Sequence, residues 1–256
     1  MSFPVYKPSA ITTVEIATQI PADFRDDHWV VYHGTSGFQA DIIEREGFDP
    51  KKHFDVKGLI DRVVKVYEEI GWWGEHRNGF PVLKSFSSFD YEHGSDGAVF
   101  FAIHPNQALL YATDQFHGGE KATALRLAIE DLRSRLKNAE KGMDDLSDAN
   151  VALIQDFFSE TDDTGIVAHK AQQSTPGVLF AVRLTDKHLP YLDYNGHMGL
   201  MSSSLIAPEH ICMKLIVPPG CRWGLNSTSL AEAMRLSPVE NQLFAAMHNL
   251  RRAKIT

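Results

Sequence analysis

Cysteine is scarce in this chain of 256 residues, and long apolar runs are missing. The two cysteines, Cys212 and Cys221, are too few for a disulfide scaffold, although a single bridge between them stays open. No run reaches the length of about 18 apolar residues that a bilayer span needs, so we expect no membrane partner. Residues 1–22 lack the basic and apolar stretches of a signal peptide, and none is expected.

Positive charge is also in deficit. The chain has 25 lysine and arginine residues against 33 aspartate and glutamate residues, which gives a formal net charge of −8. Nucleic-acid binding draws most of its affinity from neutralised phosphates, so this balance disfavours such a partner. Small basic clusters at 51–57 and 251–254 are more typical of an ordinary solvated surface. A macromolecular partner is therefore expected to be a protein rather than a nucleic acid.

Several catalytic and metal-binding motifs are absent as well. The sequence has no Gly-x-Ser-x-Gly elbow, no phosphate-binding P-loop and no His-Glu-x-x-His pair. The residues His197, His210, Cys212 and Cys221 do not have the paired spacing of a structural zinc site. We therefore expect no metal centre, and a serine hydrolase, a nucleotide triphosphatase and a zinc protease are all disfavoured.

What is present is an ordinary globular composition, with 43% hydrophobic and 23% charged residues. The length allows a full core, in one elaborated domain or two small ones. We expect a single domain over 1–256. An N-terminal arm at 1–27, a helical insertion at 113–175 and C-terminal helices at 227–252 complete the expected organisation.

The stretch from Val30 to Gly37 has the clearest local pattern. Its β-branched and aromatic residues before His33 predict a buried strand. Ser36 stands three residues before Gln39, which is the spacing of a helix N-cap, and Gly47 marks the helix end. A polar imidazole is therefore expected where a strand meets a helix, next to a glycine that lets backbone approach a ligand.

A second unit of the same layout follows at 97–111, where an apolar strand precedes a helix that carries Tyr111. Further strands are predicted at 80–89, 178–184, 200–206 and 210–217, and a helix at 55–70. Two amphipathic helices in the insertion separate these strands. Together the elements predict an α+β fold.

Two motifs resemble the NAD-binding core of the ADP-ribosyltransferase superfamily, in the branch of diphtheria-toxin-like enzymes and poly(ADP-ribose) polymerases. The first is Tyr32-His33-Gly34-Thr35, which matches the family's Tyr/Trp-His-Gly-Thr/Ser strand. The second is the Gly-x-aromatic-aromatic-Ala strand at 97–102, followed by a tyrosine eleven residues after Phe100. The resemblance implies split β-sheets around an NAD cleft.

The resemblance also implies residue roles. His33 would hydrogen-bond a ribose hydroxyl of NAD⁺, and the backbone of Gly34 would pair with the nicotinamide carboxamide. Thr35 completes the NAD-binding motif. The rings of Phe100 and Tyr111 would sandwich the positively charged nicotinamide by stacking and cation–π attraction.

The family's catalytic carboxylate is usually a glutamate on a late strand, where it stabilises the oxocarbenium-like charge on the ribose. The corresponding stretch at 201–207 contains no glutamate. Ser203 or Ser204 would supply a hydroxyl without the charge, which favours single transfer over polymer formation. Glu209, which follows Pro208, is the alternative.

These features favour a mono-ADP-ribosyltransferase that moves ADP-ribose from NAD⁺ to a macromolecular acceptor and releases nicotinamide. A bacterial toxin or effector is one expected role, in the cytoplasm or delivered into a host cell without a signal peptide. Three alternatives stay open: a non-catalytic NAD or ADP-ribose-binding module, an NAD glycohydrolase and an RNA 2′-phosphotransferase. NAD⁺ is the only small molecule expected, and it is a substrate.

Overall fold

The computed structural model describes residues 3–9, 12–51, 57–71, 98–113, 120–143, 145–161, 176–194, 199–222, 224 and 245–246. The chain divides into two compact units. A sheet unit takes residues 1–53, 95–118 and 175–256, and a helical unit takes residues 54–94 and 119–174. The helix expected at 55–70 therefore belongs with the helices of the insertion.

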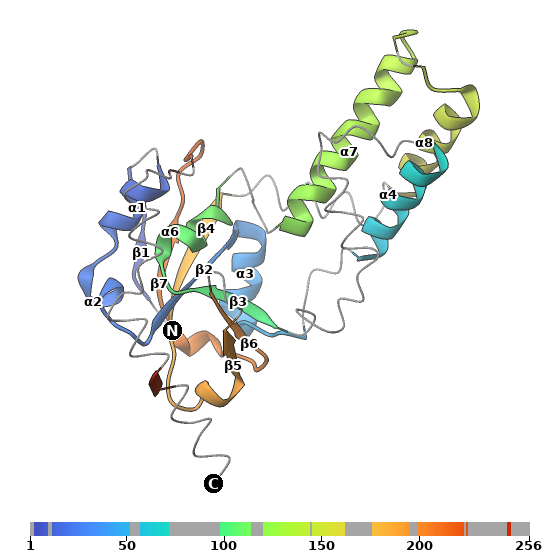
Figure 1. The fold of residues 1–256 in the computed structure, drawn as a ribbon. Coiled ribbons are helices and arrows are strands. Elements are labelled where there is room, and N and C mark those ends of the chain that lie inside the picture. Colours follow the sequence, from blue (N-terminus) through green and yellow to red (C-terminus); the bar gives the residue numbers. More distant parts are fainter. Residues whose placement is uncertain are drawn as a thin grey trace. The chain divides into compact units, whose positions relative to one another are not determined.

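The sheet unit contains both helices and strands, whereas the helical unit holds only helices in its described part (Figure 1). The sheet unit contains β1 (Val5–Tyr6), α1 (Thr13–Gln19), α2 (Ala22–Arg25), β2 (Val30–Ser36), α3 (Gly37–Glu46), β3 (Val99–Ala102), α6 (Pro105–Leu110), β4 (Gly177–Arg183), η2 (Leu189–Tyr191), β5 (Leu192–Tyr194), β6 (Gly199–Ser202), η3 (Pro208–His210) and β7 (Ile211–Ile216). The helical unit contains α4 (Lys57–Glu69), α7 (Glu120–Ala139) and α8 (Asp148–Thr161).

The described strands form one mixed sheet of seven strands in the order β1-β7-β4-β2-β3-β6-β5. Only the β1–β7 pair is parallel. The α+β class predicted from the sequence is confirmed. The described strands are joined by backbone pairing into a single sheet, where we had expected two small ones.

Pairing is uneven across the middle of the sheet. β2 pairs with β4 over seven residues, from Val30 with Arg183 to Ser36 with Gly177. β2 pairs with β3 at one position only, Tyr32 with Ala102. The sheet is therefore continuous but joined weakly between β2 and β3.

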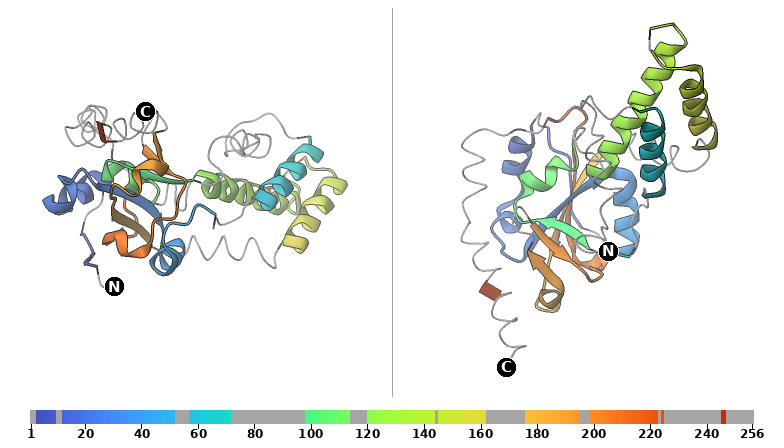
Figure 2. Two further views of the ribbon diagram at one scale, coloured as in Figure 1. Left: turned by 90° about the horizontal axis from the view of Figure 1, so that it is seen from below. Right: turned by 45° about the vertical axis from the view of Figure 1, so that its right-hand side comes forward.

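Each face of the sheet carries its own apolar core because strand residues alternate between the two faces. One cluster includes Phe48, Phe101 and Phe180, on the face that α3 covers. The other cluster includes Tyr32 and Leu109, on the face that α1 and α6 cover. Figures 1 and 2 show these helices on opposite sides of the sheet.

The predicted start and end of α3 are confirmed. The Ser36 side chain accepts a hydrogen bond from the Gln39 amide, and Gly47 ends the helix with a positive φ of 80°. A Cβ on Gly47 would lie 2.4 Å from the Ile206 carbonyl oxygen, so the chain passes close to the segment after β6 at this point. Phe48 and Ile206 bond to each other through their backbones there.

The helical unit has a separate core between α4, α7 and α8. The predicted apolar stripe of α7 is buried at Leu125, Ile129 and Leu132. The Tyr67 hydroxyl of α4 donates to Ala128 O at 3.1 Å and Asp131 Oδ2 at 2.7 Å, tying α4 to α7. In the described part of the chain, no helix is both long and apolar enough to cross a membrane.

Other predictions fare unevenly. The strand predicted at 200–206 ends earlier, at Ser202, and a short strand that was not predicted, β5, precedes it. The arm at 1–27 forms one edge strand and two short helices. The strand predicted at 80–89 lies outside the described residues, as do the C-terminal helices at 227–252 except for helical residues 245–246.

Candidate active site

His33 lies in the middle of β2, half-buried, with its ring reaching the neighbouring strand. Its Nδ1 lies 2.8 Å from the carbonyl oxygen of Phe100 in β3. A carbonyl oxygen can only accept a hydrogen bond, so Nδ1 carries the proton of the neutral ring. Nε2 is then left with a lone pair and can accept a hydrogen bond.

Two phenyl rings fix the His33 imidazole. Phe48 meets it edge-on, with ring centroids 5.1 Å apart, and Phe101 packs beside it at 5.7 Å. Burial lowers the pKa of His33 below its ordinary value of 6.5, and the bond to Phe100 opposes that effect in part. The ring is therefore neutral at pH 7.

Two backbone hydrogen bonds show which residues of β2 face β4. Leu184 N–H donates to Trp29 O at 2.7 Å, and Gly37 N–H donates to Pro176 O at 2.8 Å. Alternate residues of an antiparallel strand direct their backbone groups to opposite neighbours. The odd-numbered residues of β2 therefore bond to β4, and the even-numbered residues, Gly34 included, direct N–H and C=O toward β3.

The β2–β3 register would next place Gly34 opposite Phe100, because Tyr32 is opposite Ala102. Pairing ends before this position. The acceptor that Gly34 N–H would have used, Phe100 O, instead takes the hydrogen of His33 Nδ1. We call the unpaired position, formed by the backbones of Gly34 and Phe100, the seam.

Gly34 is required by packing as well as by any ligand. A Cβ there would lie 1.7 Å from the Ala108 carbonyl oxygen of α6. Gly177 in β4 meets the same helix end, because its Cβ would lie 1.7 Å from Ala112 O. We had attributed the glycine at 34 to a nicotinamide alone; the structure adds the close approach of the α6 backbone.

The two predicted stacking residues lie on the α6 side of the sheet. Ala102 packs in the cluster under α6, and Phe100, two residues earlier, faces the same way. Its side chain is 41% exposed. Tyr111 caps the C-terminal end of α6 and is half-buried. The ring of His33 lies on the opposite face, so His33 meets Phe100 through the seam rather than ring to ring.

The remaining residues of the first motif have structural partners. Thr35 is 5% exposed. The Tyr32 hydroxyl donates to Phe24 O at 3.1 Å, and burial raises the pKa of Tyr32 well above its ordinary value. Neither side chain is therefore displayed for reaction, and the Tyr32 hydroxyl ties β2 to α2.

The candidate catalytic serines after β6 make side-chain hydrogen bonds within their own turn and to Tyr191. Ser204 is half-buried, and its carbonyl oxygen accepts from the Ser202 hydroxyl at 3.0 Å. Ser203 is tied to Tyr191, whose carbonyl oxygen accepts from both the Ser203 amide and hydroxyl. These bonds organise the turn after β6.

Glu209 is exposed in η3, the turn that leads into β7. β7 is separated from β2 by β4, and the residues level with His33 are Phe180 and Lys214. Glu209 precedes Lys214 by five residues, beyond the far end of the strand. The sheet therefore does not bring this carboxylate beside His33.

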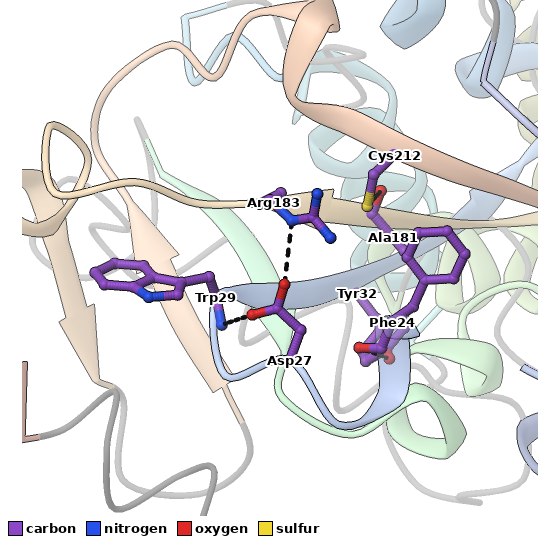
Figure 3. A network of polar contacts seen from close by, with 7 residues as sticks. All are labelled: Phe24, Asp27, Trp29, Tyr32, Ala181, Arg183 and Cys212. Carbon is purple, nitrogen blue, oxygen red and sulfur yellow. Dashed lines mark hydrogen bonds and ion pairs between the residues drawn. The ribbon is translucent and has the colours of Figure 1, made fainter. Parts of the chain in front are cut away.

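Polar contacts anchor the start of β2 (Figure 3). Asp27 accepts from the Trp29 amide at 2.9 Å and from Arg183 Nε at 3.1 Å, which joins the entry of β2 to the end of β4. Cys212 Sγ donates to Ala181 O at 3.3 Å, and burial raises the pKa of the thiol to about 11. Cys212 and Cys221 are both free thiols, so the bridge left open by the sequence is not formed.

Sequence reasoning missed three contributors to this site. Phe48 and Phe101 hold the imidazole, and Ala108 brings the α6 backbone against Gly34. Phe101 was visible as the second aromatic of its motif. Phe48 carried no local signal, because its contact with His33 depends on how α3 returns to the sheet.

Among the described residues, no cluster of three or more histidine, cysteine, aspartate or glutamate side chains could hold a metal ion. Comparison with known proteins adds no assignment. No family model, curated protein or solved structure matches the chain.

Proposed function

We propose that the chain binds NAD⁺ at the seam and transfers its ADP-ribose to a macromolecular acceptor, with release of nicotinamide. The observation that carries the proposal is the end of β2–β3 pairing at Tyr32 and Ala102. It leaves the Gly34 N–H and C=O directed toward β3 with no backbone pair at that position. A donor and an acceptor on one strand edge complement a primary carboxamide, which offers one acceptor and one donor of its own.

The aromatic side chain next to the seam supports the same ligand. Phe100 is the exposed large apolar residue of β3, so part of its surface is accessible to a partner. A nicotinamide ring in NAD⁺ carries positive charge, so stacking and cation–π attraction would both favour it there. Tyr111, at the end of α6, would supply the second ring of the sandwich.

The proposed reaction breaks the bond between the nicotinamide nitrogen and ribose C1′. The electron pair of that bond stays with nicotinamide, which leaves neutral, and an acceptor nucleophile bonds to C1′ and loses its proton. The His33 ring packs with Phe48 and Phe101 on the face opposite Phe100 and Tyr111, so the ribose contact expected from the sequence is not retained, and His33 would act through the seam. The fold proposed on this basis is the split sheet of ADP-ribosyltransferases, with the split at the seam.

The acceptor is proposed to be a protein, because the net charge of −8 disfavours an RNA or DNA surface. The same charge argues against RNA 2′-phosphotransfer. A toxin or effector acting in the cytoplasm of a host remains our proposal for the biological role.

Purified protein incubated with adenylate-labelled NAD⁺ and cell lysate tests the proposal. We expect nicotinamide release together with labelled protein bands. The Phe100→Ala variant should lower the rate of nicotinamide release at least about fivefold, because it removes stacking of about 1 kcal/mol or more. Phe100→Tyr should retain activity.

The matched control is Leu205→Ala, which removes another exposed apolar side chain, 51% exposed, outside the proposed contact. Its rate should equal that of the unmodified protein. Equal rates for Phe100→Ala and the unmodified chain would contradict the proposed stacking. Release of free ADP-ribose without labelled protein would indicate the glycohydrolase instead.

A second candidate, a non-catalytic NAD-binding module, is favoured by the position of Glu209 away from His33. Such a module would use the seam and Phe100 for binding and would need no carboxylate. Calorimetry distinguishes the two functions. Binding of NAD⁺ without nicotinamide release supports the module, and binding with release supports the transferase.

A further inference from the structure

We propose that His33 is a positioning residue that keeps the seam open: its Nδ1–H binds Phe100 O and draws that carbonyl out of line with the Gly34 amide, so that Gly34 does not pair with β3. The inference rests on the proposed function only where it assigns the seam to NAD⁺ binding. The structural claim concerns the two strands and stands without any ligand.

Three observations carry the inference. The Gly34 N–H would meet Phe100 O if the ladder continued by one step, because Tyr32 and Ala102 are opposite each other. That oxygen instead lies 2.8 Å from His33 Nδ1. The imidazole is also held from the other side by Phe48, with ring centroids at 5.1 Å, so it cannot easily withdraw.

The consequence for ligand binding is indirect. If the ladder closed, the Gly34 amide would be consumed by Phe100 O, and a carboxamide would have to break that bond to bind. An unpaired strand edge with both groups available avoids this cost. His33 would therefore raise affinity through Gly34, without needing to touch the carboxamide itself.

Asparagine and glutamine separate the two nitrogen positions of the imidazole. An asparagine side chain places its NH₂ near the position of Nδ1, whereas glutamine extends farther, toward the position of Nε2. His33→Asn can keep the bond to Phe100 O, and His33→Gln can keep only a contact made by Nε2. His33→Ala removes both.

The direct measurement is hydrogen exchange of the Gly34 amide, followed by NMR. The sequence contains three His-Gly pairs, ending at Gly34, Gly94 and Gly118, so protein labelled with ¹³C-carbonyl histidine and ¹⁵N-glycine gives three selected signals. The signal missing from the His33→Gln spectrum is that of Gly34. In that variant, ¹³C-glutamine labelling recovers it alone, because no other Gln-Gly pair occurs.

We expect the Gly34 amide to exchange rapidly in the unmodified protein and in His33→Asn. In His33→Ala and His33→Gln it should exchange at least about 100-fold more slowly, because the ladder closes. If His33 had only a structural role, its loss would loosen β2, and the Gly34 amide would exchange faster rather than more slowly. Slow exchange in the unmodified protein, or equally rapid exchange in all four proteins, would overturn the proposal.

Nicotinamide titration of the same samples keeps this proposal separate from the proposed function. If both hold, the dissociation constant should rise about tenfold or more in His33→Ala and His33→Gln, and little in His33→Asn. If the exchange pattern appears but no sample binds nicotinamide or NAD⁺, the proposed function fails while the role of His33 stands. A third outcome is weak nicotinamide binding in His33→Asn, normal binding in His33→Gln and no change in exchange of the Gly34 amide. It would assign the effect on binding to Nε2 and refute the role proposed here.

Discussion

At the level of single residues, two histidines stay neutral because they are buried. Burial lowers the pKa of His33, and burial together with the neighbouring His210 ring, 4.4 Å away, lowers that of His188. His188 Nδ1 also accepts from the Thr185 amide at 3.0 Å, a bond that protonation at Nδ1 would destroy. Both side chains therefore resist protonation in the folded protein.

This resistance predicts that stability falls as the pH decreases. The unfolded chain takes up protons near the ordinary histidine pKa of 6.5, while the folded chain takes them up only at lower pH. The free energy of unfolding should be largest above about pH 7 and decline toward pH 5. Urea unfolding across this range measures it, and His188→Asn, which keeps an acceptor for Thr185, should flatten the curve. An unchanged slope in that variant would contradict the prediction.

The motif residues were predictable from the sequence, but their immediate surroundings were not. The His33–Gly34 pair stood out because an imidazole next to a glycine at a strand end is an unusual local pattern. That Phe100 O would face His33 depends on the register of two strands more than sixty residues apart, which no local signal fixes.

At the level of elements, α6 and the residues that follow it pass close to β2 and β4 at two glycines. Gly34→Ala would place a Cβ 1.7 Å from Ala108 O, and Gly177→Ala would do the same at Ala112 O. Each should lower the free energy of unfolding by about 2 kcal/mol or more, because backbone must move to accept the methyl group. Thermal unfolding monitored by circular dichroism measures the loss.

Gly58 in α4 provides the control, since a Cβ there would meet nothing within 4 Å. Gly58→Ala should be neutral or stabilise by about 0.5–1 kcal/mol, because alanine favours the helix and restricts the unfolded chain. If Gly34→Ala proved equally harmless, α6 would not contact β2 as closely as described.

Capped helices were the easiest elements to predict, and short edge elements the hardest. Ser36 and Gly47 identified both ends of α3. A capping box at Thr12 and Glu15, which the prediction of an N-terminal arm did not include, begins α1. β1 and β5, with two and three residues, have too little pattern to be recognised without their partners.

At the level of the whole molecule, the sheet unit and the helical unit have separate cores. The sequence predicted helices within 113–175, where α7 and α8 lie, but did not group α4 with them. An amphipathic helix shows which of its faces is apolar and not what covers it. In α4 the covering elements, α7 and α8, come more than fifty residues later.

Separate cores predict separate responses to mutation. Tyr67→Phe removes the hydroxyl that donates to Ala128 O and Asp131, which should destabilise the helical unit by about 1–2 kcal/mol. Hydrogen exchange with mass spectrometry should show faster exchange in α4, α7 and α8 and no change in β2 and β4. Lys65→Ala, which removes an exposed ion pair with Glu69, is the control and should change exchange little. Faster exchange throughout the sheet would show instead that the units unfold together.

The single backbone pair between β2 and β3 has a mechanical consequence. It divides the seven described strands into a group of four and a group of three whose strands pair directly only at Tyr32 and Ala102, with the His33 hydrogen bond beside that pair. A carboxamide bound to Gly34 would supply a missing rung between the two groups. A ligand bound there would therefore reduce the motion of the two groups of strands relative to each other.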